Sequence, residues 1–293
     1  MRGTPRPSRS WSSSSPPSSR RSKSDWQGTP DMFSHQSLPA RIVSQILLLI
    51  AVGVLALPLG MILFVSMQGE GPVNYLRVLE GTPFVRFFVN SVIVSVSTVV
   101  LVTLTATMAA FATSVLRPRG AGIAQLLLIA GLALPAIALV VPLFYAVQSL
   151  GLLNTYWAVI IPLAAISLPF GVLVASNYIR SLPVEVYEAA KVDGASDWQY
   201  FWRVLLPMCR PILAVVVIFT FLSAWNEYLL PLIFIQNTDM QVLTQVPTYF
   251  QSQRLVDTPK IFAANVLISL PVVVLYIALQ RTFQRGLSAG AIK

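Results

Sequence analysis

The chain has few of the residues that form disulfides, metal sites and charged surfaces. Its 293 residues include one cysteine, Cys209, and one histidine, His35, and only 11% are charged. A single cysteine cannot form a disulfide within the chain, and one Cys with one His cannot form a Cys/His zinc site. None of the four lysines follows a glycine, so there is no phosphate-binding loop ending in Gly-Lys. We therefore predict no metal or ATP site on this chain and no enzymatic activity.

Hydrophobic residues are abundant instead, and they are grouped into long runs. They make up 55% of the chain, too many for an ordinary soluble domain. Crossing about 30 Å of hydrocarbon takes roughly 20 residues of helix. We predict an all-α polytopic membrane protein with about six transmembrane helices, at residues 42–67, 87–114, 122–147, 156–179, 212–236 and 262–283.

The basic residues predict the orientation of these spans. Successive segments between the predicted spans lie on alternating sides of the membrane. Sixteen of the 20 Lys and Arg residues then fall on one side, and four, Arg77, Arg86, Arg254 and Lys260, fall on the other. Because cytoplasmic loops carry an excess of Lys and Arg, we expect both termini and the loop at about residues 181–211 to be cytoplasmic. This distribution explains the net charge of +9 without a nucleic-acid partner.

The loop at about residues 181–211 is the longest polar insertion between spans. Helix formers follow Pro183, and Gly194 then supplies a stop that can adopt the left-handed conformation. Ser196 and Gln199 have the spacing of a capping box. The second helix carries Trp198, Phe201, Trp202 and Leu205 at helical spacing, opposite Asp197 and Arg203. This pattern predicts two short helices joined at a glycine elbow; an interfacial helix lying on lipid headgroups is the alternative.

Several short motifs in this order resemble the membrane subunits of ATP-binding-cassette importers. In the cytoplasmic loop they are Glu188-Ala189-Ala190, Asp193-Gly194-Ala195 and Leu206-Pro207, which resemble the EAA motif. Elsewhere they are GLLNTYW at 151–157, LPF at 168–170, WNEY at 225–228 and GLSAG at 286–290. Together they resemble the carbohydrate-uptake branch, and in particular the smaller permease of maltose-type systems, over roughly residues 90–293.

The resemblance implies a function and a set of partners. It implies a permease subunit that imports a sugar or sugar-like solute across a bacterial cell membrane. ATP and Mg would be bound by two separate ATP-binding-cassette ATPase subunits, with a second permease and an extracytoplasmic solute-binding protein completing the importer. Glu188, Ala189, Ala190, Asp193, Gly194, Ala195 and Pro207 would couple this chain to the ATPases.

The ends of the chain differ from the hydrophobic region of residues 39–283. Residues 1–38 are rich in Ser, Pro and Arg, with almost no aliphatic residues before Met32. Such a segment is predicted to be a disordered cytoplasmic tail; a basic arm attracted to anionic headgroups is the alternative. It departs from the short N-terminus usual in the resembled family, so a misassigned start codon is a further alternative. Residues 284–293 are predicted to form a cytoplasmic C-terminal tail that reaches the ATPases.

The run Trp225-Asn226-Glu227-Tyr228 places polar side chains inside a predicted span. A carboxylate at membrane depth is costly unless it faces the bundle interior or water, so these four residues are candidates for the translocation path. The alternative is a polar packing or gating cluster, with Trp225 and Tyr228 as aromatic-belt anchors. Asn90, Asn177 and Asn265, near span ends, are interpreted as caps or interhelical hydrogen bonds, with a ligand contact as the alternative.

Two other functions compete with the importer hypothesis. An ion-coupled secondary carrier would act without an ATPase, but few ionisable residues lie in the spans and no inverted repeat is evident. A membrane scaffold without a transport path would not need the EAA-like loop or Glu227. The importer permease is therefore the favoured prediction.

Overall fold

The computed structural model describes residues 38–251 and 256–291. This part of the chain is built from helices joined by short loops, which confirms the predicted all-α class. The α-helices are α1 (Leu38–Ser66), α2 (Val73–Gly81), α3 (Phe84–Phe111), α4 (Ala121–Gly131), α5 (Val140–Ser149), α6 (Trp157–Ser181), α7 (Val184–Val192), α8 (Asp197–Tyr200), α9 (Leu206–Met208), α10 (Arg210–Trp225), α11 (Leu229–Phe234) and α12 (Thr258–Ala291). Two π-helical turns, η1 (Ala112–Leu116) and η3 (Phe201–Leu205), and three 3-10 turns, η2 (Ala136–Leu139), η4 (Thr238–Met240) and η5 (Leu243–Phe250), complete the described elements.

The chain divides into two units, Met1–Leu57 and Pro58–Lys293. The predicted N-terminal tail, residues 1–38, lies outside the described residues except for Leu38, where α1 begins. At the other end, α12 continues as helix to Ala291, so most of residues 284–293 belongs to this helix. The last two residues lie outside the described part.

Four of the six predicted spans are single helices. Arg41–Ser66, Phe84–Leu116, Trp157–Ser181 and Thr258–Ala278 are each long and apolar enough to cross a membrane. Prolines do not interrupt them: Pro162 and Pro169 lie buried inside α6. Two bent pairs of helices, Ala121–Gly131 with Ala136–Ser149 and Asp197–Met208 with Arg210–Trp225, give up to six spans if each pair counts as one. The first pair corresponds to the predicted span 122–147, whereas the second bends by 78° just before the predicted span 212–236 begins.

The predicted span 122–147 is broken at a proline. Helix α4 ends at Gly131, and the chain resumes as η2 and α5 at an angle of 100° to α4. Pro135 has an extended backbone with ψ 121° and stands between the two halves. Because proline lacks an N–H and disfavours a helical residue before it, Pro135 favours a break of the helix at this point.

The predicted span 212–236 is also not one helix, which corrects the expectation that Glu227 lies along a continuous span. Helix α10 ends at Trp225, and α11 begins at Leu229. Pro231 explains the break, since a proline ring excludes the carbonyl four residues earlier from a helical bond. That carbonyl belongs to Glu227, and it accepts a hydrogen bond of 2.8 Å from the Thr244 hydroxyl instead.

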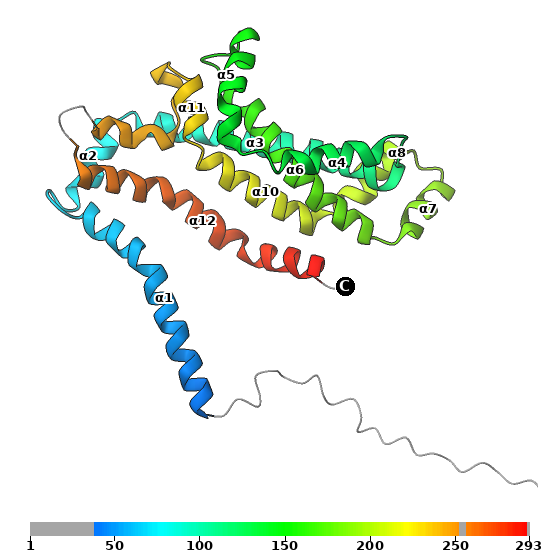
Figure 1. Cartoon of the computed structure of the whole chain (residues 1–293), viewed down its shortest axis with the longest axis horizontal. Coiled ribbons are helices and arrows are strands. Elements are labelled where there is room, and N and C mark those ends of the chain that lie inside the picture. The colour runs from blue at the N-terminus through cyan, green and yellow to red at the C-terminus, as the bar shows by residue number, and fades with distance from the viewer. Residues whose placement is uncertain (1–37, 252–255, 292–293) are drawn as a thin grey trace, which may run out of the picture. The chain divides into compact units, whose positions relative to one another are not determined.

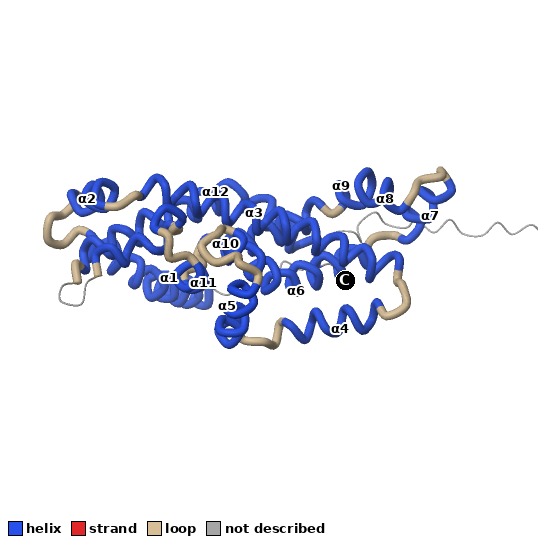
Figure 2. Tube along the Cα trace, turned by 90° about the horizontal axis from the view of Figure 1, so that it is seen from above, coloured by secondary structure: helices blue, strands red, loops and turns tan. Residues whose placement is uncertain are grey.

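Helices α3, α6 and α10 lie side by side and form the centre of the second unit, with α12 along α10 (Figures 1 and 2). Gly171 permits the close approach of the first three. A Cβ atom at this position would stand 2.9 Å from the Ala106 Cβ, 3.4 Å from a Val102 methyl and 3.5 Å from a Val216 methyl. The absence of a side chain at Gly171 therefore sets the helix spacing here.

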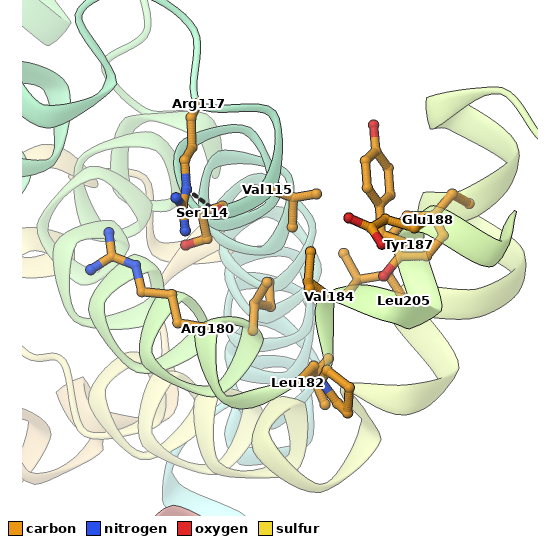
Figure 3. Close-up of a pocket in the computed structure, with 12 residues that line it drawn as sticks. Ser114, Val115, Arg117, Arg180, Leu182, Val184, Tyr187, Glu188 and Leu205 are labelled. Carbon is orange, nitrogen blue, oxygen red and sulfur yellow. Dashed lines mark hydrogen bonds between the residues drawn. The ribbon is translucent and has the colours of Figure 1, made fainter. Parts of the chain in front are cut away.

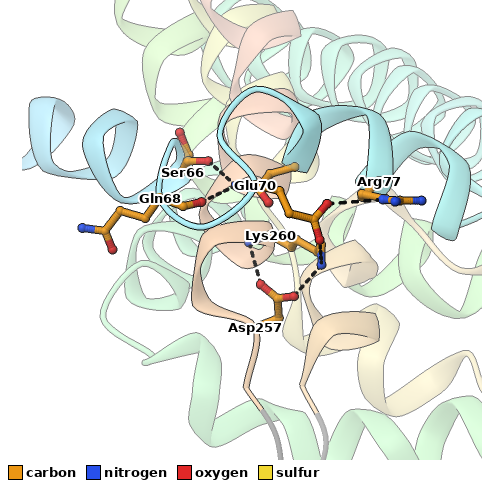
Figure 4. Close-up of polar contacts among 7 residues, drawn as sticks. Ser66, Gln68, Glu70, Arg77, Asp257 and Lys260 are labelled. Atoms are coloured by element: carbon orange, nitrogen blue, oxygen red, sulfur yellow. Dashed lines mark hydrogen bonds and ion pairs between the residues drawn. The ribbon is translucent and has the colours of Figure 1, made fainter.

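Polar contacts join the chain before α2 to the start of α12 (Figure 4). Lys260 lies 2.7 Å from a carboxylate oxygen of Asp257 and 3.5 Å from one of Glu70, and Arg77 lies 3.3 Å from the other Glu70 oxygen. The Asn74 amide donates to the carbonyls of Ser66 and Gln68, at 2.9 and 2.7 Å. These contacts hold the loop 67–72 against the first turn of α12.

Candidate functional site

The predicted helix–elbow–helix element is present between the predicted spans, at α7 and α8. Helix α7 ends at Val192, and Gly194 follows with φ 79°, the left-handed conformation predicted for it. Backbone N–H groups of Gly194 and Ala195 donate to the carbonyls of Lys191 and Ala190, at 3.0 and 2.9 Å, and close the end of the helix. These two bonds fix the elbow at Gly194 to the last turn of α7.

The second helix begins with the predicted capping box. The Gln199 N–H donates to the Ser196 hydroxyl at 3.2 Å, and the Ser196 N–H donates to the Gln199 side-chain oxygen at 2.9 Å. These two bonds satisfy backbone groups that a helix start otherwise leaves unpaired. The start of α8 is thus determined by two residues that the sequence identifies.

The buried face of the second helix differs from the predicted one. Phe201 and Leu205 are buried as expected, at 2% and 0% exposure, but Trp198 and Trp202 are 60% and 38% exposed. The turn Phe201–Leu205 is π-helical, and its smaller rotation per residue places Leu205 below Phe201 instead of below Trp198. Phe201, Leu205 and Cys209 pack in one core cluster with residues of α3, α6 and α10, including Phe111, Ile179 and Ile212.

A polar cluster ties α7 to α8 across the elbow. The Tyr187 hydroxyl donates to Asp197 at 2.7 Å, and the Lys191 ammonium lies 2.7 Å from the same carboxylate oxygen. The hydrogen bond from Lys191 lowers the pKa of Asp197 below its usual range and raises that of Lys191, so both groups are charged at neutral pH. Tyr187 also packs edge-on against Tyr200, with ring centroids 4.9 Å apart. The two helices therefore form one rigid element.

One face of α7 remains exposed. It carries Glu185, Glu188, Ala189 and Val192, which have helical spacing, and Val192 is 87% exposed. Asp193, Gly194 and Pro207 are also exposed, whereas Ala190 and Ala195 are partly buried on the inner side. The structure thus brings the seven predicted coupling residues into one element, with an acidic and apolar stripe facing outward.

A cavity of about 350 Å³ separates α7 from the ends of η1 and α6 (Figure 3). Arg117 and Arg180 lie on one side of it, and Tyr187 and Glu188 lie on the other. The Arg117 guanidinium donates to the Ser114 carbonyl at 2.9 Å, and Arg180 donates to the Gln125 side chain. The space leaves room for α7 to shift relative to these helix ends.

We expect Ser196→Ala to loosen the start of α8 without unfolding the chain. Loss of an N-cap side chain costs about 1 kcal/mol, which corresponds to roughly fivefold faster amide exchange at Gln199. Hydrogen exchange with mass spectrometry measures this rate. Ser181→Ala is the matched control, because the Ser181 hydroxyl bonds only the Tyr178 carbonyl within its own helix. Equal exchange at Gln199 in both variants would contradict a stabilising role for the capping box.

The four residues at 225–228 have different surroundings in the structure. Trp225 is 2% exposed, and its ring N–H donates to the Ile268 carbonyl at 3.1 Å. Its ring also stacks on Phe221 and meets Phe88 edge-on, so Trp225 is part of the core. Asn226 and Tyr228 are exposed, as the translocation-path hypothesis requires.

Glu227 has a structural role, capping a helix, that the sequence did not indicate. One of its carboxylate oxygens accepts hydrogen bonds from the N–H groups of Leu229 and Leu230, at 2.9 and 3.0 Å. This is the interaction of a capping residue with the start of α11, where negative charge is favoured. The carboxylate is therefore used within the chain at the helix break.

A polar cavity lies beside Asn226 and Tyr228. Its volume is about 470 Å³, and it is lined by Asn226, Tyr228, Thr244, Pro247, Thr248, Gln251, Asn265, Ile268 and Ser269. Sequence reasoning interpreted Asn265 as a structural group and did not consider Ser269. Their spacing of four residues on the apolar α12, which places both on one face, was the available signal. Asn90, by contrast, bonds Tyr156 and the carbonyls of Asp239 and Gln241, as its structural interpretation predicted.

This combination of spans, broken helices and a helix–elbow–helix element is matched by known transport proteins. The chain belongs to the family of binding-protein-dependent transport system inner membrane components, whose pattern matches residues 102–289. The diacetylchitobiose uptake system permease protein NgcG of Streptomyces coelicolor is 38% identical over 222 residues, covering 75% of this chain and 74% of the relative. The melibiose/raffinose/stachyose import permease protein MelC of Bacillus subtilis is 30% identical over 221 residues, covering 75% and 80%.

A solved structure supports the fold assignment. A chain of a bacterial ABC transporter involved in the import of the acidic polysaccharide alginate aligns with a TM-score of 0.70 at 22% identity, covering 85% of this chain and 99% of that one. The family match and the relatives confirm the resemblance stated from the motifs, and the structural likeness confirms the fold. The protein is a multi-pass inner-membrane permease subunit of an ABC importer, a transport component and not an enzyme.

Proposed function

We propose that this chain imports a sugar or sugar-like solute, and that ATP hydrolysis on a partner drives it through the element 183–211. The observation that carries this proposal is the rigid helix–Gly194–helix unit, which is anchored on its inner side and exposed on its outer side. Phe201 and Leu205 fix it to the spans, while Glu188 and Val192 face outward. A push on α7 would therefore reach α3, α6 and α10 through one packed cluster.

The partners follow from what the chain itself lacks. It has no Gly-Lys phosphate loop, so we propose that two ATP-binding-cassette ATPase subunits bind ATP and Mg and receive α7 in a surface cleft. Six spans are few for enclosing a path, so a second permease completes it, and a binding protein delivers the solute from outside. In this arrangement both termini and α7 are cytoplasmic, as the basic residues indicate.

A sugar is the proposed solute because relatives at 30–38% identity carry names of sugar-uptake permeases. The family membership favours this hypothesis over an ion-coupled carrier. The importer and the ion-coupled carrier differ in their energy source, and uptake assays in proteoliposomes can distinguish ATP from a cation gradient. Uptake should need the ATPase and ATP and should persist without a cation gradient; uptake by this chain alone would overturn the proposal.

We expect Val192→Glu to release the ATPase while leaving the chain in the membrane. Val192 is 87% exposed at the centre of the proposed contact, and a charge desolvated there without a partner would weaken binding strongly. Affinity purification of the tagged chain in mild detergent, with quantitative mass spectrometry, should show at least a tenfold loss of co-purified ATPase.

Val256→Glu is the matched control for this experiment. Val256 is 60% exposed in the loop before α12, far along the chain from α7, so the same substitution should leave ATPase recovery unchanged. If Val192→Glu retained the ATPase at the control level, α7 would not be the docking element.

A further inference from the structure

A further cavity of about 470 Å³ lies between the end of η1, the start of α4 and the end of α6. Arg117 and Arg180 line it with the neutral polar side chains of Thr113 and Gln125, and its other lining residues are glycine, alanine and proline, so none is acidic. The cavity of about 350 Å³ that also touches the two arginines is lined by Glu188 as well (Figure 3). The first of these, called the arginine cavity below, is therefore the more favourable one for an anion.

Both guanidinium groups keep donors for a ligand. Arg117 donates through Nε to the Ser114 carbonyl at 2.9 Å, and Arg180 donates through one terminal nitrogen to the Gln125 side chain. Because a guanidinium carries several further N–H donors, most of them are left for a ligand. Within residues 38–251 and 256–291, neither arginine forms a salt bridge. Two cations thus line one cavity without a counter-charge from the described chain.

Arg117 stands at a backbone position where glycine is the usual residue. It follows η1 with φ 46°, in the left-handed region, and its N–H donates to the Ala112 carbonyl at 2.9 Å. Glycine is common at such helix ends because it has no Cβ, whereas a residue with a side chain is strained there. Strain of this kind points to a use of the side chain and not of the backbone.

The arginine cavity lies where apolar spans end. Phe84–Leu116 stops directly before Arg117, and Trp157–Ser181 carries Arg180 in its last turn. Beside the cavity, α4 presents the exposed apolar side chains of Ile123, Leu126 and Leu127 at helical spacing. Cations at span ends next to an exposed apolar helix face match the two parts of a phospholipid, its phosphate and its acyl chains.

We propose that the arginine cavity binds the phosphate of an anionic phospholipid, whose acyl chains lie along α4. Arg117 and Arg180 donate charge-assisted hydrogen bonds to the phosphate oxygens, for which the planar guanidinium is well suited. The headgroup is anionic because a zwitterionic choline lipid would bring its own cation beside two arginines. This inference goes beyond the importer function and does not depend on the solute.

A bound lipid would act on the end of α6. Arg180 lies three residues before Pro183, from which α7 continues, so a phosphate held by Arg180 fixes the last turn of α6 to the membrane surface. The element 183–211 would then start from a helix end that lipid holds in place.

The test uses the full tagged chain, purified in mild detergent with the subunits that accompany it. Native mass spectrometry measures binding of phosphatidylglycerol and phosphatidylcholine in separate titrations. We expect phosphatidylglycerol to bind about tenfold more tightly or better. Arg117→Gly and Arg180→Gln should each lower its affinity about tenfold, because each removes charge-assisted hydrogen bonds. Arg117→Gly should not lower the melting temperature, since glycine suits φ 46°.

Arg119→Gln is the matched control. Arg119 is exposed two residues from Arg117 and does not line the cavity, so this variant loses the same charge and should keep the wild-type affinity. Equal affinities in Arg119→Gln and the two cavity variants would overturn the inference. So would arginine variants that release a protein subunit while their lipid affinity stays unchanged, because the arginines would then face a protein.

Inorganic phosphate, added as a competitor, separates a lipid from a free anion. It should displace phosphatidylglycerol only weakly, because it makes no contact with the apolar face of α4. If inorganic phosphate bound as tightly as phosphatidylglycerol, the lipid assignment would be wrong. None of these outcomes bears on the importer function, which ATP-dependent uptake tests separately.

Discussion

Gly194→Val should reduce solute uptake at least tenfold while the chain still inserts and binds its ATPase. Gly194 has φ 79°, and no heavy atom outside its immediate neighbours lies within 4 Å of the position of its Cβ, so the conflict is one of backbone conformation and not of space. A β-branched residue strongly disfavours the left-handed conformation, which costs even an ordinary residue roughly 1–2 kcal/mol. Relief of that strain reorients α7 relative to α8, so ATP hydrolysis would no longer move the spans.

Gly194→Asn separates the backbone effect from the loss of glycine itself. Asparagine tolerates the left-handed region better than other residues with a side chain, so this variant should keep most of the uptake. Uptake, ATP hydrolysis and expression are measured in parallel for both variants. Full uptake by Gly194→Val at normal expression would refute a coupling role for the elbow.

Gly171→Val should prevent accumulation of folded protein, the largest effect on stability that the structure predicts. The added atoms would enter the contact of α3, α6 and α10, where a single Cβ already stands 2.9 Å from the Ala106 Cβ. Gly171→Ala is milder: overpacking by one methyl group costs about 1–3 kcal/mol, enough to lower the melting temperature by about 5 °C. Fluorescence-detected size exclusion after heating measures both variants.

A compensating substitution tests whether the cause is this contact. In the double variant Gly171→Ala with Ala106→Gly, the methyl group added at position 171 is offset by the methyl group removed at position 106. This variant should recover most of the lost stability. Gly122→Ala, at a helical glycine whose Cβ position has no neighbour within 4 Å, should leave the melting temperature unchanged. A normal yield of folded Gly171→Val would show that the three helices can separate without penalty.

Local features of the element 183–211 could be predicted well. The left-handed Gly194 and the capping box of Ser196 and Gln199 depend on residues within four positions of one another, and both are present. The side of the second helix that packs inward could not be predicted in the same way. An ideal helix would group Trp198 with Leu205, and the π-helical turn Phe201–Leu205, formed against Phe111 and neighbouring residues, removes Trp198 from the buried face.

The sequence by itself determined the family, the all-α membrane class, four unbroken spans and the elbow, because hydrophobic length, turn chemistry and short motifs are local properties. Only the tertiary structure decided what the polar residues of the spans do. Glu227 caps α11 because Pro231 breaks the helix there, and Trp225 is held in the core by Ile268. Asn265 meets Tyr228 in one cavity although 37 positions separate them in the sequence. Such pairings depend on how distant helices pack, and no local pattern in the chain encodes them.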